Sequence, residues 1–96
     1  MKRNLVQLNK KMAKELLKKV LGVSGSALMK DKTGDGADIY RMAMGELNIT
    51  VENDWFERNG LFVLTIGSTT QHMRLYFHPD TLEEDYEAEE AWKKKE

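Results

Sequence analysis

The segment from Asp31 to Asp38, DKTGDGAD, carries oxygen-bearing side chains at alternate positions. Calcium loops use such a pattern, with a glycine at the sixth position for a sharp turn and a bidentate glutamate at the twelfth. Gly36 fits the sixth position, but Met42 stands at the twelfth. Because the bidentate carboxylate supplies much of the calcium affinity, we interpret the segment as a Gly/Asp-rich turn before a strand. We expect no metal site and no cofactor.

The two histidines are the other candidates for chemistry. His72 and His78 stand six positions apart, so on one strand they share a face with Arg74 and Tyr76. Histidine titrates near neutral pH, but a zinc site takes at least three protein ligands, and the chain has no cysteine and no third histidine. No serine lies in a nucleophile elbow. We therefore expect no catalytic residue and no enzyme activity.

Charge is divided between the two ends of the chain. The first 21 residues hold seven basic side chains and one acid, whereas residues 80–92 hold seven acids and no base. Lys11, Lys14 and Lys18 lie on one face of a helix opposite an apolar stripe. Lysine-rich helices bind nucleic acid, acidic membranes or acidic partners, although the commoner role of such a face is to contact solvent.

The elements that would position these groups begin with a helix over residues 4–21, with Asn4 as its N-cap and Gly22 after its end. Residues 22–37 are rich in glycine and serine and predict a loop. The segment HPDTLEEDYEAEEAWKKKE predicts a helix over residues 79–94, with Asp80 and Glu83 as a capping box. This last helix has few apolar side chains, so we expect it to dock weakly.

Residues 38–78 predict four antiparallel strands joined by hairpins. Gly45-Glu46 fits a two-residue turn that pairs Met44 with Leu47, and Asn59-Gly60 fits a second turn that pairs Trp55 with Leu64. With these turns the apolar residues of all four strands fall on one face. This agreement predicts a meander sheet with the N-terminal helix packed against that face.

The second sheet face is also partly apolar. It combines a central group of aromatic and aliphatic side chains with polar neighbours, which is typical of a binding surface; its candidate partner-binding residues are Phe56, Leu61, Val63, Arg74 and Tyr76. If this face is exposed, Val63→Glu should leave the fold intact. The alternative is that the C-terminal helix covers the face.

The 96 residues fit a single domain, and the absence of cysteine suits a reducing compartment. We expect an α+β fold, a two-layer α-β-β-β-β-α domain. The function expected is that of a small cytoplasmic module that binds another protein, as bacterial, phage or mobile-element accessory proteins do. A homodimer through the second sheet face is also open. The alternative is nucleic-acid binding through the basic helix, and we expect no membrane association.

Overall fold

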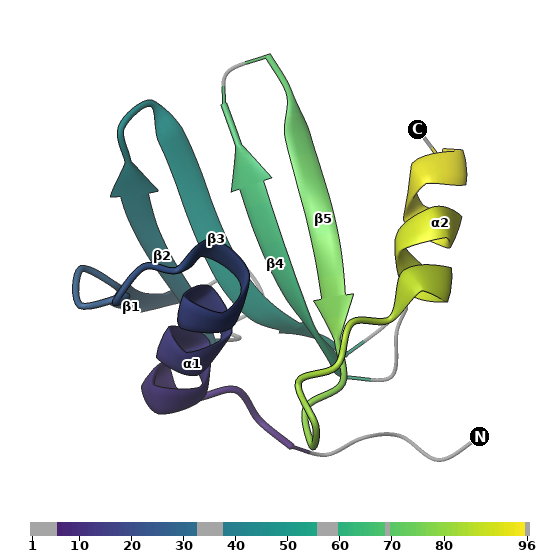
Figure 1. Ribbon diagram of the computed structural model, residues 1–96, viewed down its shortest axis with the longest axis horizontal. Helices are drawn as coiled ribbons and strands as arrows, with labels where there is room; N and C mark the ends of the chain where they lie inside the picture. The colour runs from purple at the N-terminus through teal and green to yellow at the C-terminus, as the bar shows by residue number, and fades with distance from the viewer. Residues whose placement is uncertain (1–5, 33–37, 56–59, 69, 96) are drawn as a thin grey trace.

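A computed structural model describes residues 6–32, 38–55, 60–68 and 70–95. Of Lys95 only the backbone is described. The chain forms an α+β fold in which a helix at each end flanks an antiparallel sheet (Figure 1). The elements in chain order are α1 (Lys10–Leu21), β1 (Met29–Lys32), β2 (Asp38–Met44), β3 (Leu47–Asp54), β4 (Leu61–Gly67), β5 (His72–Phe77) and α2 (Tyr86–Lys95).

The sheet has five strands in the order β1-β2-β3-β4-β5, so the expectation of four strands was wrong. The additional strand, β1, lies within the expected loop of residues 22–37. Its sequence is MKDK, and all four of its residues are exposed. It has no β-branched or aromatic residue and no alternation of apolar and polar residues. An exposed edge strand can do without both, because it pairs with a neighbour on one side only.

The register of the hairpins agrees with the sequence at two places and differs at one. Met44 pairs with Leu47 across Gly45-Glu46, as expected, and Leu64 pairs with Leu75. Leu64 pairs with Val51 rather than Trp55, because β3 ends at Asp54 and β4 begins at Leu61. The shift between Val51 and Trp55 is an even number of residues, so the assignment of side chains to faces remains correct.

Helix α1 begins at Lys10, later than expected. Asn9 is its N-cap and accepts a hydrogen bond from the backbone N–H of Met12 at 2.9 Å. The expected N-cap, Asn4, lies outside the described residues. Residues 6–8 are not helical; Leu8 is buried, and its N–H is bound to Asn53. The helix ends as expected, with Gly22 in the left-handed region at φ 71°.

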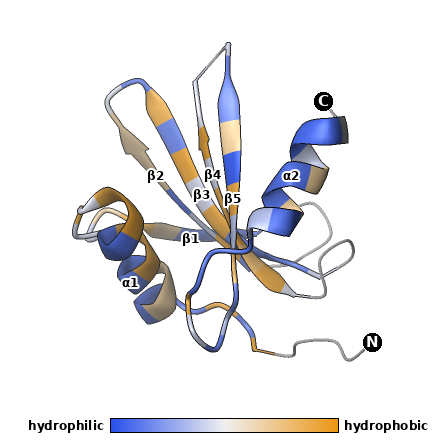
Figure 2. Cartoon of the chain, turned by 45° about the vertical axis from the view of Figure 1, so that its right-hand side comes forward, coloured by the Kyte–Doolittle hydropathy of each residue, from blue (hydrophilic) through white to orange (hydrophobic). Residues whose placement is uncertain are grey.

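The main core lies between α1 and the first sheet face. Ala13, Leu16 and Leu17 of α1 are fully buried, and Figure 2 shows hydrophobic residues in orange between hydrophilic ones along the strands. The buried sheet residues in this core are Tyr40, Ile49, Val51, Phe62, Leu64 and Phe77. They come from four strands at alternating positions, which is the face predicted from the hairpin parity.

Helix α2 packs on the other face of the sheet, and Figure 2 shows the sheet between the two helices. Ala88 and Trp92 contact a second buried cluster formed by Leu61, Val63 and Tyr76. The fold therefore has three layers over β4 and β5, not two. The helix begins at Tyr86 rather than residue 79, because the Asp85 carboxylate accepts the N–H of Ala88 at 3.0 Å and caps this end.

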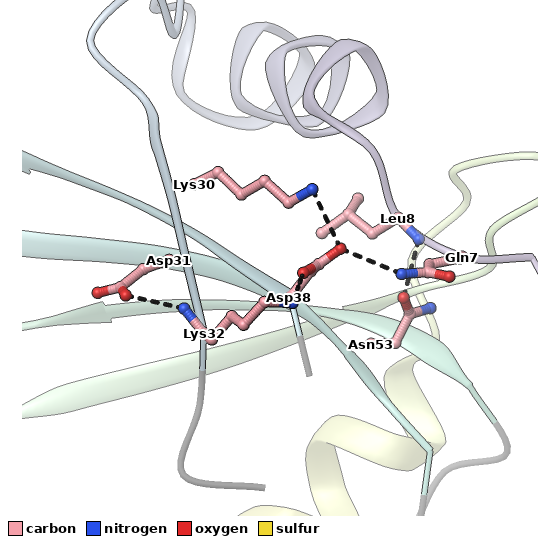
Figure 3. Close-up of polar contacts among 7 residues, drawn as sticks. All are labelled: Gln7, Leu8, Lys30, Asp31, Lys32, Asp38 and Asn53. Atoms are coloured by element: carbon pink, nitrogen blue, oxygen red, sulfur yellow. Dashed lines mark hydrogen bonds and ion pairs between the residues drawn. The ribbon is translucent and has the colours of Figure 1, made fainter. Parts of the chain in front are cut away.

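One buried amide ties the N-terminal segment to the sheet. Asn53 is 9% exposed, and its Oδ1 accepts the N–H of Leu8 at 2.8 Å (Figure 3). Its Nδ2 donates to the carbonyls of Val6 and Gly60, both at 3.0 Å. Three hydrogen bonds from one side chain satisfy this buried amide and fix the chain just before α1.

Candidate functional site

The second sheet face is divided into two parts. The part over β4 and β5 lies under α2. On β2, β3 and the end of β4, the side chains of this face form a row of cross-strand neighbours, in which Arg41 pairs with Thr50 and Thr50 with Thr65. We call this part the open strip, defined by Arg41, Ala43, Asn48, Thr50 and Thr65. Of these side chains, the first three are exposed and the two threonines are half-buried.

The open strip is shallow and bordered by larger side chains. Met29 pairs with Arg41 at its outer side and is 70% exposed. A depression of about 280 Å³ is lined in part by Met29, Arg41, Ala43, Asn48 and Thr50. Among the described residues, the buried cluster under α2 contains none of the five residues of the strip. The strip therefore has a floor of small side chains between an exposed methionine and a helix.

The residues predicted for partner binding lie mostly beside the strip, under α2. Leu61, Val63 and Tyr76 are 9%, 3% and 1% exposed. The alternative interpretation, that the C-terminal helix covers this face, is therefore the correct one for these three residues. Phe56 lies outside the described residues. Arg74 is half-buried at the border between α2 and the open strip.

Arg74 belongs to a cluster of cationic and aromatic groups around Trp92. Its guanidinium lies 5.7 Å from the centroid of the Trp92 ring, and its Nη1 donates to the Tyr76 hydroxyl at 3.3 Å. The His72 ring is 5.5 Å from the Trp92 ring. Because His72 and Arg74 both belong to β5, these contacts pack the end of α2 against that strand.

Ion pairs join the edge strand β1 to its neighbour β2. Asp38 accepts from Lys32 at 3.0 Å and lies 3.4 Å from Lys30, and Figure 3 shows the same carboxylate meeting Gln7. The hydrogen bond from Lys32 is the main cause that lowers the pKa of Asp38. These lysines and the short length of β1 protect this edge from pairing with another strand.

The segment read as a turn rather than a calcium loop lies at this edge. Its Thr33–Ala37 portion falls outside the described residues. At its start, Asp31 accepts from Arg41 at 2.9 Å and from the N–H of Lys32 at 2.8 Å. The Lys32 backbone first, and then Arg41, lower the pKa of Asp31. The two flanking carboxylates are thus each engaged by cations of the chain.

The opposite edge, along β5, is occupied by the segment that leads into α2. The backbone carbonyl of Tyr76 accepts a hydrogen bond from the N–H of Asp85 at 2.7 Å. The backbone N–H of Tyr76 donates a hydrogen bond to Glu89 Oε2 at 3.2 Å. One step along, the N–H of His78 donates to the carbonyl of Glu83 at 2.8 Å. The outward backbone groups of this half of the edge are therefore satisfied within the chain.

Glu89 is an ionisable group in the interface between α2 and β5. Its residue is 6% exposed. Burial raises the pKa of Glu89 to about 7, and a hydrogen bond with Glu84 adds to the effect. The Tyr76 N–H and the Lys93 ammonium act in the opposite direction. Because burial disfavours the charged carboxylate, we expect deprotonation of Glu89 to weaken the docking of α2.

The two histidines do not form a common site. His72 lies in β5 beside Trp92, whereas His78 follows β5, and its Nε2 is 3.3 Å from Asp85. Among the described residues, no group of three or more His, Asp or Glu side chains is placed to hold a metal ion.

The lysines of α1 face away from the core. Lys11 and Lys18 are exposed, and Lys14 is half-buried, with its stem against the loop at Gly25. Lys19, on another side of the helix, donates to the carbonyl of Leu82 at 2.6 Å. In the part of the chain that the structure describes, Lys11, Lys14 and Lys18 form no ion pair within the usual contact distance.

Sequence reasoning did not identify two residues that matter here, Asn53 and Glu89. Each interrupts an apolar pattern with a polar group at an inward position. Asn53 continues the alternation of Ile49 and Val51, and Glu89 follows Ala88 on the inward side of α2. A polar residue at such a position is the available sequence signal for a buried hydrogen bond.

Comparisons with protein-family models, with curated proteins and with solved structures find no match to this chain. Among the described residues, no helix is long and apolar enough to cross a membrane.

Proposed function

We propose that the chain is a cytoplasmic protein-interaction module without catalytic activity, and that a protein partner docks on the open strip. The observation that carries this proposal is the incomplete cover of the second sheet face. Helix α2 buries Leu61, Val63 and Tyr76, while the strip beside them keeps exposed side chains at Arg41 and Ala43.

The composition of the strip and its borders suits a protein partner. Arginine, methionine and tryptophan are enriched in protein interfaces, and Arg41, Met29 and Trp92 supply one of each around a floor of small residues. An antiparallel sheet can also leave one face to solvent with no partner at all. If the strip binds a protein, a substitution in it should weaken that binding. If the strip only contacts solvent, the substitution should have no effect on binding.

The test is affinity capture with three forms of the full chain, each in extracts treated with nuclease. Ala43→Trp fills the strip at an exposed position, and Lys11→Glu changes charge on the far side of the molecule as a control. The proposal expects a protein partner to be retained by the wild type and by Lys11→Glu and to be lost with Ala43→Trp. Retention by all three forms would contradict it.

A second candidate is nucleic-acid binding through the lysines of α1. It is favoured by the outward position of Lys11, Lys14 and Lys18 and by the placement of α1 and α2 on opposite faces of the sheet. That placement weakens the objection that the acidic helix would repel phosphate within a Debye length of about 8–10 Å. The acids at Glu83 and Glu84, which line a cleft with Lys19, still disfavour binding at that end of α1.

The same capture experiment distinguishes the second candidate. Nucleic acid recovered when the capture is repeated in extracts without nuclease, and lost in Lys11→Glu rather than in Ala43→Trp, would favour the lysine face. Binding of this kind should also weaken steeply with salt, since it depends on the release of counterions from phosphates.

A further inference from the structure

We propose that α2 is a detachable cover, which leaves the sheet as one unit when Glu89 loses its proton, while α1 and the sheet stay folded. The proposal concerns the helix that covers the second sheet face, and it holds whether or not a partner docks on the open strip. It follows from the division of the buried residues into two clusters, from the place where the chain is anchored before α2 and from the polar contacts that hold α2.

Helix α2 is held by a small cluster that is separate from the main core. Among the described residues, α2 contributes Ala88 and the half-buried Trp92 to this cluster, and neither belongs to the main core. A helix of ten residues is too short to be stable in water without such packing, and elements with few buried apolar contacts open first. Release of α2 would uncover Leu61, Val63 and Tyr76 beside the open strip.

The segment before α2 is anchored on the side of the main core. The side chain of Leu82 packs against the main cluster, and its carbonyl accepts a hydrogen bond from Lys19 Nζ at 2.6 Å. The N–H of Leu82 donates to the carbonyl of His78 at 2.7 Å, and the N–H of His78 donates to the carbonyl of Glu83 at 2.8 Å. None of these contacts involves α2, so the hinge lies between Glu83 and the start of the helix at Tyr86.

The polar contacts at Glu89 make the docking of α2 depend on a proton. Glu89 is 6% exposed, and its Oε2 accepts the backbone N–H of Tyr76 at 3.2 Å. Its carboxyl group also forms a hydrogen bond with that of Glu84, and two carboxyl groups can share a hydrogen bond only when one of them holds a proton. Without this proton, two carboxylates would repel each other in a buried site that salt screens little. Departure of α2 from the sheet brings the charge of Glu89 into water.

The cations near α2 do not replace this proton. Lys93 favours the charged form of Glu89, but it is exposed and its Nζ lies 3.6 Å from Glu90. Arg74 of β5 lies over the Trp92 ring, and arginine keeps its charge over the whole physiological pH range, so this contact holds α2 equally before and after the titration. The β4 side chains under α2 are apolar.

Two histidines near α2 need their own controls, because histidine titrates near neutral pH. The His72 ring lies 5.5 Å from the Trp92 ring. His78 Nε2 lies 3.3 Å from Asp85, and this ion pair requires a protonated imidazole. Loss of that charge would loosen the segment before α2 in the same direction as deprotonation of Glu89, so variants must separate the two.

The test uses the absence of cysteine from the chain, which makes one introduced thiol a specific reporter of opening. Val63→Cys places the thiol beneath α2, and Val51→Cys places it in the main core, where Val51 is fully buried. The rate of labelling by dithiodipyridine, divided by the rate for a free thiol peptide at the same pH, measures how often each site opens. We expect Val63→Cys to label at least about tenfold faster than Val51→Cys, since it needs only the release of α2. Leu61→Cys serves as a second reporter beneath α2 if Val63→Cys does not fold.

The pH dependence identifies the proton. For Val63→Cys, the corrected rate should rise at least about tenfold from pH 5 to pH 8, because the docked Glu89 keeps its proton up to about pH 7 and the released one does not. Adding Glu89→Gln should remove the rise, whereas adding His72→Gln or His78→Gln should keep it. Equal labelling of positions 63 and 51 would overturn the separate unit. A rise that survives Glu89→Gln, or no rise at position 63, would overturn Glu89 as the group that releases α2.

Discussion

The carboxyl group of Glu89 takes the place of a neighbouring strand beside Tyr76, whose backbone N–H it binds at 3.2 Å. The carbonyl of the same tyrosine accepts the N–H of Asp85 at 2.7 Å. Together these two bonds attach the start of α2 to the edge of the sheet. They also explain how a helix with few apolar residues is held over Leu61 and Val63.

Stability should fall as the pH rises through the titration of Glu89. The pKa of Glu89 is raised from 4.5 to about 7 by burial and by Glu84, so the folded state favours the protonated form. The resulting stabilisation is fully present below pH 4.5 and is lost as the pH rises through about 7. Glu89→Gln keeps an acceptor for Tyr76 without a charge.

We therefore expect Glu89→Gln to be more stable than the wild type at pH 8, by about 1–2 kcal/mol, and nearly equal at pH 4. Urea unfolding of both forms across this range measures the difference. The ion pair of His78 with Asp85 is common to both forms and cancels in the comparison. A difference that does not change with pH would contradict the buried acid as its cause.

Asn53→Ala should destabilise the fold by about 2–4 kcal/mol, because it removes three hydrogen bonds and leaves the buried N–H of Leu8 without its acceptor. Asn48→Ala, an exposed amide on the other face of the same strand, is the matched control and should change stability by less than about 0.5 kcal/mol. Denaturant unfolding measures both. Equal effects would show that Asn53 is not the link between the N-terminal segment and the sheet.

Leu64→Ala should cost about 2–5 kcal/mol, since Leu64 is fully buried between Val51 and Leu75 beneath α1. His72→Ala removes an exposed ring beside Trp92 and should cost less than about 1 kcal/mol. Thermal or urea unfolding gives the comparison. If the two substitutions had similar effects, the assignment of the first sheet face to the core would be wrong.

Val63→Glu should destabilise the isolated protein, contrary to the expectation from sequence. Val63 is 3% exposed under α2, so the new carboxylate is buried or displaces the helix. We expect a loss of about 3 kcal/mol or more. Thr50→Glu, in the neighbouring strand and beside Arg41, should cost less than about 1 kcal/mol. Hydrogen exchange of α2 should rise in Val63→Glu alone, and an unchanged α2 would contradict the cover.

The faces of the sheet could be predicted from sequence because hairpin turns and alternation constrain the same strands. Leu64 was assigned to the core although its partner was taken to be Trp55 rather than Val51, since an even shift preserves the face. The strand β1 could not be found, because its stability comes from pairing with β2 and its side chains are all exposed.

The position of α2 could not be predicted for a different reason. Its apolar residues are few, and its docking depends on Glu89 and Asp85, which read as solvent-exposed acids in the sequence. The sequence therefore placed Leu61, Val63 and Tyr76 on the sheet face where the structure has them, but they lie beneath a helix. The open strip next to them consists of small and polar side chains, which give no apolar pattern to detect.

The most direct test of the open strip as a docking surface is photo-crosslinking of the full chain in its own cells, with benzoylphenylalanine at position 43 or, in a matched form, at position 11. Both positions are exposed, one on the strip and one on α1. We predict a discrete crosslinked protein for position 43 that survives nuclease, and no such product for position 11. A product from position 11 alone, or none from position 43, would contradict the proposal that a protein partner docks on the open strip.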